Sequence, residues 1–240
     1  MSDPTNTPTV VLVHGGFADS SYWVPVIEDL QANDIPVLAP ANPLRGLAHD
    51  AAYTASFVNQ VDGPVLLVGH SYGGAVITEA GANAANVVGL VYIAAFGLDQ
   101  GEPFSQVWKD FGDTAILTAA EPLNYPLDDG GTAVELSISP EKYKDAFAGD
   151  LSDEEIRVLA VRQRPFAAIF EDSPSVAAWK SLPSWFLVAS QDHAIPPEAQ
   201  RHMAKRMGAQ TVEVDASHSV ALSRPAATAE IIRSAVASGA

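Results

Sequence analysis

The segment from Val65 to Ile77 constrains the fold more than any other part of the chain. Its apolar start, Val65–Val68, stops at Gly69-His-Ser-Tyr-Gly73 and passes at once into small and apolar residues that suit a helix. Glycines on both sides of the serine allow a turn that is packed too closely for a Cβ. A tight strand-to-helix turn with this G-x-S-x-G sequence lifts a serine hydroxyl out of the sheet edge. The sequence therefore predicts that Ser71 is presented as a nucleophile.

Strand-like and helix-like patterns alternate on both sides of this turn. Continuous apolar runs predict strands that are covered on both faces, as in a parallel sheet. These runs occupy residues 9–13, 35–39, 65–68, 87–95, 184–189 and 210–214. Besides the helix after Ser71, helical patterns occupy residues 17–33, 50–61, 197–207 and 225–237. The alternation predicts an α/β fold, with an open, mostly parallel central sheet and helices on both faces.

Residues 98–183 interrupt this alternation. They are acidic and aromatic, contain scattered Pro and Gly, and show no further strand–helix repeat of the same kind. One helix is predicted over residues 153–164, where Ser152 and Glu155 have the spacing of a capping box. We interpret residues 98–183 as an inserted, mainly helical cap, which leaves residues 1–97 and 184–240 as the two parts of the core.

The composition of the chain argues against several classes of function. The net charge of −16 would repel phosphate backbones and anionic lipids, so neither a nucleic acid nor a membrane is an expected partner. The absence of cysteine excludes disulfides, thiolate catalysis and zinc–sulfur sites. Met1–Pro8 is polar and unlike a signal peptide, and no apolar stretch approaches the roughly 20 residues that span a bilayer. A cytoplasmic protein is the resulting expectation.

Three reactive residues fall where a parallel sheet binds its ligands, beyond the carboxyl ends of the strands: Ser71, Asp192 and His218. A serine hydroxyl is a poor nucleophile until an imidazole takes its proton, and the imidazole needs a carboxylate that fixes its tautomer. Asp192 is favoured as this carboxylate because nucleophile, acid and base then follow the chain order known for such sheets. Asp99, after the preceding strand, stays open as the alternative. Asp215 is disfavoured because it lies too close to His218 in the same loop.

An oxyanion needs two backbone N–H groups that point at the developing charge. Tyr72, directly after the serine, should supply one. The loop His14-Gly-Gly-Phe17, after the first strand, should supply the other from Phe17 or, as the alternative, from Gly16. We expect His14 to brace this loop through hydrogen bonds. No histidine spacing fits a metal motif and no glycine pattern fits a nucleotide, so neither a metal nor another cofactor is expected.

Several short motifs together carry a resemblance to a known family. They are His14–Phe17, Asn42-Pro-Leu-Arg-Gly46, Gly69–Gly74, Tyr92-Ile-Ala-Ala-Phe96, Ser190-Gln-Asp192 and Ser217-His218. With these motifs the chain resembles small α/β-hydrolases, in particular bacterial serine esterases akin to plant methylesterases and hydroxynitrile lyases. The resemblance implies the α/β-hydrolase fold and cofactor-free hydrolysis of carboxylic esters. It places the triad at Ser71, Asp192 and His218 and the oxyanion donors at Phe17 and Tyr72.

Two departures bear on the subtype. The hydroxynitrile lyases of this group have a threonine after the first-strand histidine and a lysine after the catalytic histidine, where this chain has Gly15 and Ser219. Without that lysine no cation receives cyanide, so lyase activity is disfavoured. Serine at position 71 likewise disfavours haloalkane dehalogenases and epoxide hydrolases, which need a carboxylate nucleophile.

The expected function is therefore hydrolysis of small to medium hydrophobic esters through an acyl-enzyme. The cap should furnish an apolar pocket for this small-molecule substrate, with the aromatic residues Phe104, Trp108, Phe111, Tyr125, Phe166 and Phe170, and Gly16 should also line it. Alternatives that stay open are the same triad used for carbon–carbon cleavage, amide hydrolysis or perhydrolysis, and a non-catalytic ligand-binding protein on the same fold. A homodimer also stays open.

Overall fold

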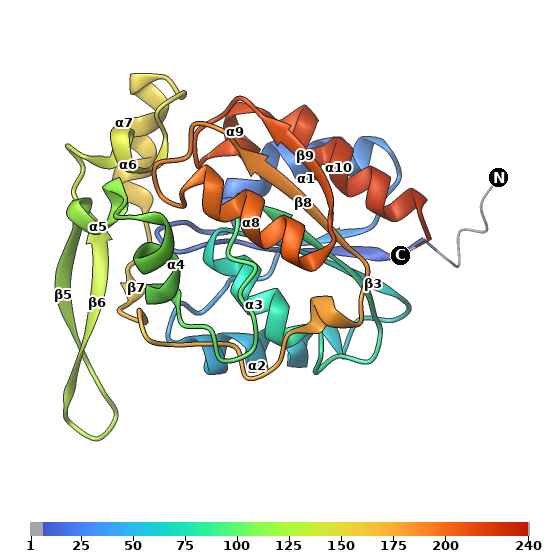
Figure 1. Cartoon of the computed structure of the whole chain (residues 1–240), viewed down its shortest axis with the longest axis horizontal. Coiled ribbons are helices and arrows are strands. Elements are labelled where there is room, and N and C mark those ends of the chain that lie inside the picture. The colour runs from blue at the N-terminus through green and yellow to red at the C-terminus, as the bar shows by residue number, and fades with distance from the viewer. Residues whose placement is uncertain (1–6, 240) are drawn as a thin grey trace.

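A six-stranded sheet forms the centre of the molecule (Figure 1). The computed structural model describes residues 7–239, so most of the polar segment Met1–Pro8 lies outside the described residues. In spatial order the strands are β2 (Val37–Leu38), β1 (Thr9–Val13), β3 (Val65–His70), β4 (Val87–Ile93), β8 (Ser184–Ala189) and β9 (Gln210–Val214). All neighbouring strands in this sheet are parallel. The chain runs from β1 to β2 on one side and from β3 to β4 on the other, so the loops after β1 and β3 diverge. Such a switch point is where open parallel sheets bind ligands.

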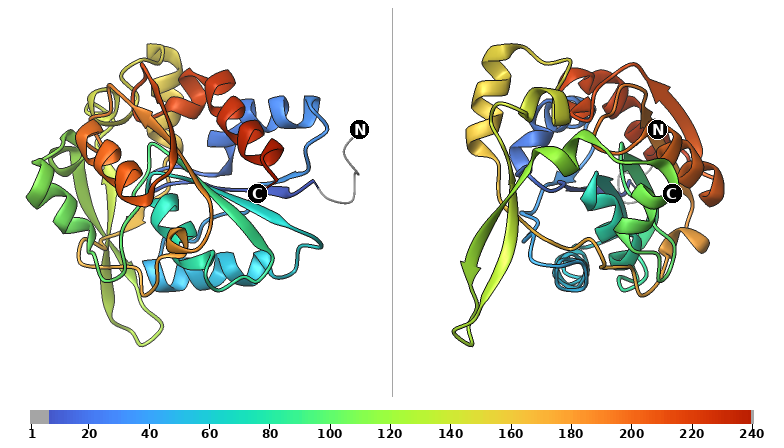
Figure 2. Two further views of the ribbon diagram at one scale, coloured as in Figure 1. Left: turned by 45° about the vertical axis from the view of Figure 1, so that its right-hand side comes forward. Right: turned by 60° about the vertical axis from the view of Figure 1, so that its left-hand side comes forward.

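Both faces of this sheet are covered by helices because successive side chains of a strand point in opposite directions. Val11 and Val13 of β1 belong to the core on one face, with helices α2 (Leu47–Val58), α3 (Tyr72–Ala80) and α8 (Pro197–Met207). Val10 and Leu12 belong to the core on the other face, with helices α1 (Val24–Ala32), α9 (Val220–Ser223) and α10 (Pro225–Ala237). The left view of Figure 2 shows α1 and α10 on one side of the sheet and α2 on the other.

The inserted segment lies over the carboxyl ends of the strands, at the end of the molecule opposite the start of β1 and the end of α10 (Figure 1). Its helices are α4 (Phe104–Phe111), α5 (Ala115–Ala119), α6 (Tyr143–Phe147) and α7 (Asp153–Arg162). It also contains an antiparallel sheet of β5 (Ala120–Pro126), β6 (Thr132–Ile138) and β7 (Phe166–Ala167), which the sequence analysis missed. Short 3₁₀ helices occupy Ser20–Trp23 in the core and Ala178–Lys180 near the end of the insertion. We propose residues 98–183 as the extent of this cap, between core segments 1–97 and 184–240.

The predicted elements agree with the structure most closely after the cap. The structure has β8, α8, β9 and α10 with the predicted bounds. The capping box of α7 is also confirmed, because Glu155 N–H donates to Ser152 Oγ and Ser152 N–H donates to Glu155 Oε2. The predicted strand at residues 35–39 is shorter, since only Val37 and Leu38 pair with β1 at the edge of the sheet. Over residues 7–239, no helix combines the length and apolarity needed to cross a membrane.

Candidate active site

Ser71 occupies a strained turn between β3 and α3. Its backbone has φ +54° and ψ −124°, a conformation that costs a non-glycine residue of the order of 1–3 kcal/mol. Close packing explains the glycines around it: a Cβ on Gly69 would collide with the carbonyl oxygen of Gly73, and a Cβ on Gly73 with that of Val13. A Cβ on Gly15 would lie 2.7 Å from the Cβ of Ser71. The turn therefore exists only because three neighbouring backbone positions carry no side chain.

His218 and Asp192 form a buried pair beside this turn. His218 Nδ1 lies 2.7 Å from Asp192 Oδ2, and neither side chain is exposed to solvent. The other carboxylate oxygen, Oδ1, accepts hydrogen bonds from Ala194 N–H at 2.7 Å and Ile195 N–H at 2.9 Å. The carboxylate fixes the tautomer of the ring, with the proton on Nδ1. His218 Nε2 is then left as the acceptor, and it is buried with no hydrogen-bond partner among the described residues.

The side chains of His70 and Tyr22 hold the backbone of His218. The carbonyl oxygen of His218 accepts hydrogen bonds from His70 Nε2 at 3.0 Å and from Tyr22 Oη at 3.4 Å. The rings of Tyr22 and His70 are stacked with centroids 4.2 Å apart, and the rings of His70 and His218 lie 4.6 Å apart. Burial, with the neighbouring His218 ring as a smaller cause, lowers the pKa of His70 well below its usual value. His70 therefore stays neutral and keeps its Nε2 proton for the carbonyl.

The alternative carboxylate lies elsewhere. Asp99 pairs with Lys180, with 2.5 Å between Oδ1 and Nζ, and its side chain is one-third exposed. No hydrogen bond joins Asp99 to His218, whose Nδ1 faces Asp192. Of the two carboxylates that the sequence left open, the structure brings Asp192 to the imidazole.

The loop after β1 reaches the same region. Phe17 has a positive φ of +59°, and no hydrogen-bond acceptor for its N–H is found within residues 7–239. Tyr72 is the first residue of α3, so its N–H has no acceptor inside the helix. His14 braces the loop, with Nδ1 2.9 Å from Gly15 O and Nε2 accepting from Asn42 N–H at 2.9 Å. Burial lowers the pKa of His14 to about 4, which keeps Nε2 free to accept this bond at neutral pH.

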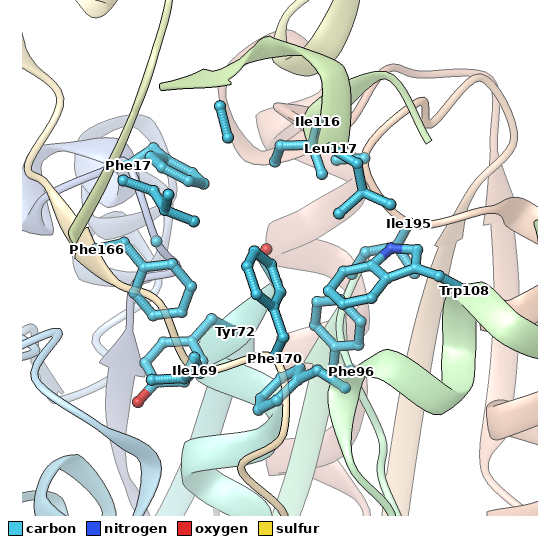
Figure 3. Close-up of a pocket in the computed structure, with 16 residues that line it drawn as sticks. Phe17, Tyr72, Phe96, Trp108, Ile116, Leu117, Phe166, Ile169, Phe170 and Ile195 are labelled. Carbon is cyan, nitrogen blue, oxygen red and sulfur yellow. The ribbon is translucent and has the colours of Figure 1, made fainter. Parts of the chain in front are cut away.

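An apolar cavity lies between these loops and the cap. Figure 3 shows Phe17 and Phe166 on one side of it, Trp108 and Phe96 on the other, and Ile116 and Leu117 from α5 closing it. The lining includes the pocket residues expected from the sequence, Gly16, Phe104, Trp108 and Phe166, as well as Phe170, Ser71 and Tyr72. Phe111 and Tyr125 do not line it, because Phe111 packs against His202 and Tyr125 against Arg45. No charged side chain is among the lining residues.

Two polar groups near the cavity are occupied by structural contacts. The side chain of Tyr72 forms part of the cavity wall. Its hydroxyl donates to Asp50 Oδ2 at 2.7 Å and is therefore already engaged. The hydroxyl of Ser219 donates to Phe147 O at 2.9 Å and does not line the cavity.

Within residues 7–239, no group of three or more His, Asp or Glu side chains is arranged to hold a metal ion.

Three contact residues were missed from the sequence. Gln200 donates from Nε2 to Asp192 Oδ2 at 2.7 Å and is fully buried. A polar residue on the buried face of a helix, next to Ala199 and four residues before Ala204, was the available signal. Tyr22 and His70 had no comparable signal, because their contacts to His218 join segments far apart in the sequence.

Comparison with known proteins assigns the family. The model of the alpha/beta hydrolase family matches residues 10–231, which is most of the chain. The chain therefore belongs to the α/β-hydrolase family, and the expected fold is confirmed.

Individual relatives are more distant. A putative chloroplastic methylesterase 11 of Arabidopsis thaliana is 24% identical over 219 residues, which are 84% of this chain but only 56% of that protein. The alpha/beta hydrolase nvfD of Aspergillus novofumigatus is 26% identical over 250 residues and covers 95% of this chain and 96% of its own length. The match to the first of these confirms the resemblance to plant methylesterases.

Solved structures share the fold. The pyrethroid hydrolase of Sphingobium faniae JZ-2 superposes with a TM-score of 0.77 at 21% identity, covering 95% of this chain and 97% of that one. Polyneuridine aldehyde esterase superposes with a TM-score of 0.81 at 17% identity, covering 95% and 98%. Family and relatives together support a hydrolase, with esterases among the proteins that the chain resembles.

Proposed function

We propose that the protein is a serine hydrolase that cleaves small to medium hydrophobic carboxylic esters through an acyl-enzyme. The observation that carries this proposal is the buried 2.7 Å contact between His218 Nδ1 and Asp192 Oδ2, beside a serine in a strained turn. This arrangement leaves His218 Nε2 free as an acceptor, on a ring that lies 4.6 Å from the ring of His70, the residue before Ser71. A family that includes hydrolases and relatives that include esterases add support.

In the first step, Ser71 Oγ attacks the ester carbonyl carbon while His218 Nε2 takes the hydroxyl proton. The carbonyl π electrons move to the oxygen, and the resulting oxyanion is held by the N–H groups of Phe17 and Tyr72. Asp192 stabilises the imidazolium that forms. The oxyanion then collapses, the ester C–O bond breaks, and the alcohol leaves with the proton from His218 Nε2.

In the second step, water attacks the acyl group on Ser71 Oγ and gives a proton to the same Nε2. The second oxyanion uses the same two N–H groups. Its collapse breaks the bond to Ser71 Oγ, which recovers its proton from His218, and the carboxylic acid is released. Acid and base functions alternate on one imidazole, so neither step needs an added cofactor.

The cavity supports an apolar substrate because its wall contains no charged side chain and is rich in aromatic rings. Two features also weigh against cyanohydrin cleavage. Gly15 has no room for a side chain beside Ser71, so the hydroxyl of a threonine could not enter there without a backbone shift. Ser219 supplies no cation, and its hydroxyl is bonded to Phe147 O.

Hydrolysis of p-nitrophenyl acetate and butyrate tests this proposal. We expect turnover by the wild type and a loss of at least about 10³-fold in kcat for Ser71→Ala, as for other triad nucleophiles. Ser56→Ala, which removes an exposed hydroxyl on α2, should keep the wild-type rate. Equal rates for the wild type and Ser71→Ala would refute the mechanism, and no turnover by the wild type would favour a non-catalytic role.

A further inference from the structure

Gln200 is a buried amide whose three hydrogen bonds all end on the segment that carries Asp192. Its side chain is fully buried on α8. Nε2 donates to Asp192 Oδ2 at 2.7 Å and to Ile195 O at 2.9 Å. Oε1 accepts from Ala189 N–H, the last residue of β8, at 3.0 Å. The amide therefore connects the end of a core strand, the loop after it and the carboxylate.

The orientation of this amide is fixed by its partners. Two of them, Asp192 Oδ2 and Ile195 O, are acceptors, and the third, Ala189 N–H, is a donor. The reversed amide would place Oε1 against two acceptors and Nε2 against a donor, so all three bonds would be lost. Such a loss is costly at a buried site. Gln200 consequently presents an N–H, and not its carbonyl oxygen, to Asp192.

This N–H shares one oxygen with the imidazole. Asp192 Oδ2 accepts from both Gln200 Nε2 and His218 Nδ1, each at 2.7 Å. The two loop N–H groups on Oδ1 restrain one side of the carboxylate, and Gln200 restrains the other independently of His218. The plane of the carboxylate is thus set by the protein scaffold, and the ring of His218 aligns to a preformed acceptor.

We propose that Gln200 is a positioning residue that acts through Asp192 to orient His218 for proton transfer. The inference rests on the proposed esterase function, because it assigns a role in the same proton transfer. Gln200 does not line the substrate cavity. Its removal should therefore lower kcat and leave KM unchanged.

The first variant is Gln200→Met, which keeps the length of the side chain and removes its hydrogen-bonding amide. We expect kcat for p-nitrophenyl butyrate to fall about 10- to 100-fold, the loss typical of a small misplacement of a catalytic group. KM should stay within about twofold of the wild-type value, because no substrate contact changes. Rates are divided by the concentration of Ser71 that a serine-reactive phosphonate labels, so that misfolded protein does not count.

A double-mutant cycle with Asp192→Asn separates positioning from general structural support. If Gln200 acts through the Asp192 carboxylate, Gln200→Met should cost less than about threefold once that carboxylate is replaced. A loss of the same size in both backgrounds would overturn the proposal, as would wild-type kcat in the single variant.

The matched control is Asn86→Leu. Asn86 Nδ2 donates to the carbonyl oxygens of Val58, Val61 and Gly63, so this variant also removes an amide that connects backbone segments. Asn86 precedes β4 and lies at the end of the sheet opposite Ser71. It should keep kcat within about twofold of the wild type. If kcat of Asn86→Leu falls as far as that of Gln200→Met, the positioning role is refuted.

Gln200→Glu provides a second test if the methionine variant yields too little folded protein. A protonated glutamic acid can replace the N–H donor to Asp192, whereas an ionised one places two carboxylates in contact. The ratio of kcat/KM for the variant to that for the wild type should therefore decrease as the pH rises, and a constant ratio would contradict the proposal. If Ser71→Ala retains wild-type activity, the esterase function itself has failed. If Ser71→Ala is inactive and the cycle is additive, only the role of Gln200 has failed.

Discussion

Mild acid should destabilise the fold through two buried histidines, His14 and His70. Neither side chain is exposed to solvent. Burial lowers the pKa of His14 to about 4 and that of His70 well below its usual value. In the unfolded chain, both rings take up a proton below a pKa of about 6.5. Between these values the unfolded state binds more protons than the folded state.

The sign and size of the effect follow from this difference in bound protons. Stability is complete above the unfolded pKa and falls as the pH decreases, because protonation then favours the unfolded chain. A histidine that stays neutral in the folded state loses about 1.4 kcal/mol per pH unit. With a folded pKa of about 4, His14 alone should remove about 2 kcal/mol from the free energy of unfolding between pH 7 and pH 5. Its contribution stops changing below a pH of about 4.

Urea unfolding at pH 7 and pH 5, followed by tryptophan fluorescence, measures this loss in the wild type and in His14→Gln. The comparison is made between the two pH values within each protein, so a constant destabilisation by the substitution cancels. The wild type should lose about 2 kcal/mol more than His14→Gln. His49→Gln, which removes a side chain that is 64% exposed, should lose as much as the wild type. Equal losses in the wild type and His14→Gln would refute the argument.

Two further predictions concern the candidate site. Asp192→Asn should lower kcat by about 10⁴-fold, because the imidazole loses the carboxylate that fixes its tautomer. Asp99→Asn should leave the rate of ester hydrolysis within about twofold of the wild-type rate. Steady-state kinetics of both variants test this, and a larger loss for Asp99→Asn than for Asp192→Asn would reject Asp192 as the carboxylate. Gly15→Ala should reduce kcat/KM about 100-fold and destabilise the protein by about 1–3 kcal/mol, since the new Cβ would lie 2.7 Å from the Cβ of the serine. Gly149→Ala, where the nearest atom is 3.8 Å away, is the control for both measurements.

The core strands could be predicted because burial on both faces requires apolar residues at nearly every position. The strand Ser184–Ala189 is buried at every position. A continuous apolar run of this length, followed by polar residues, predicts a strand that is covered on both faces in a parallel sheet. The edge strand is different. Only Val37 and Leu38 pair, beside Pro36, which has no N–H to donate. A pattern of apolar residues cannot show where pairing stops at an edge.

The antiparallel sheet of the cap was missed for another reason. Much of β5 is exposed, and it contains Pro122 and Pro126, so neither burial nor strand propensity marks it. The available signal was the turn, because Leu127-Asp-Asp-Gly-Gly131 separates two segments of equal length and Leu127 N–H donates to Gly131 O. These residues form the turn of a hairpin inside a cap that the sequence alone predicts to be mainly helical.

The triad positions could be proposed from the sequence because each follows a strand that ends at the same edge of the sheet. The groups that hold them could not, since a hydrogen bond between distant segments leaves no local pattern. Ser219 illustrates the difference. From the sequence it is the position where the related lyases have a lysine, and its meaning is the loss of a cation. In the structure its hydroxyl donates to Phe147 O, and the ring of Phe147 lies 4.8 Å from the ring of His218.

The same loop is joined to the cap on both sides of the histidine. Ser217 donates its hydroxyl to Asp150, in the loop between α6 and α7, and Ser219 donates to the end of α6. A lysine at position 219 would place a cation where the structure has a fully buried hydroxyl, and burial of an unpaired charge is costly. The serine therefore does more than omit the lyase cation. It helps to dock the cap onto the histidine loop, so the packing of α6 and the position of the imidazole depend on each other.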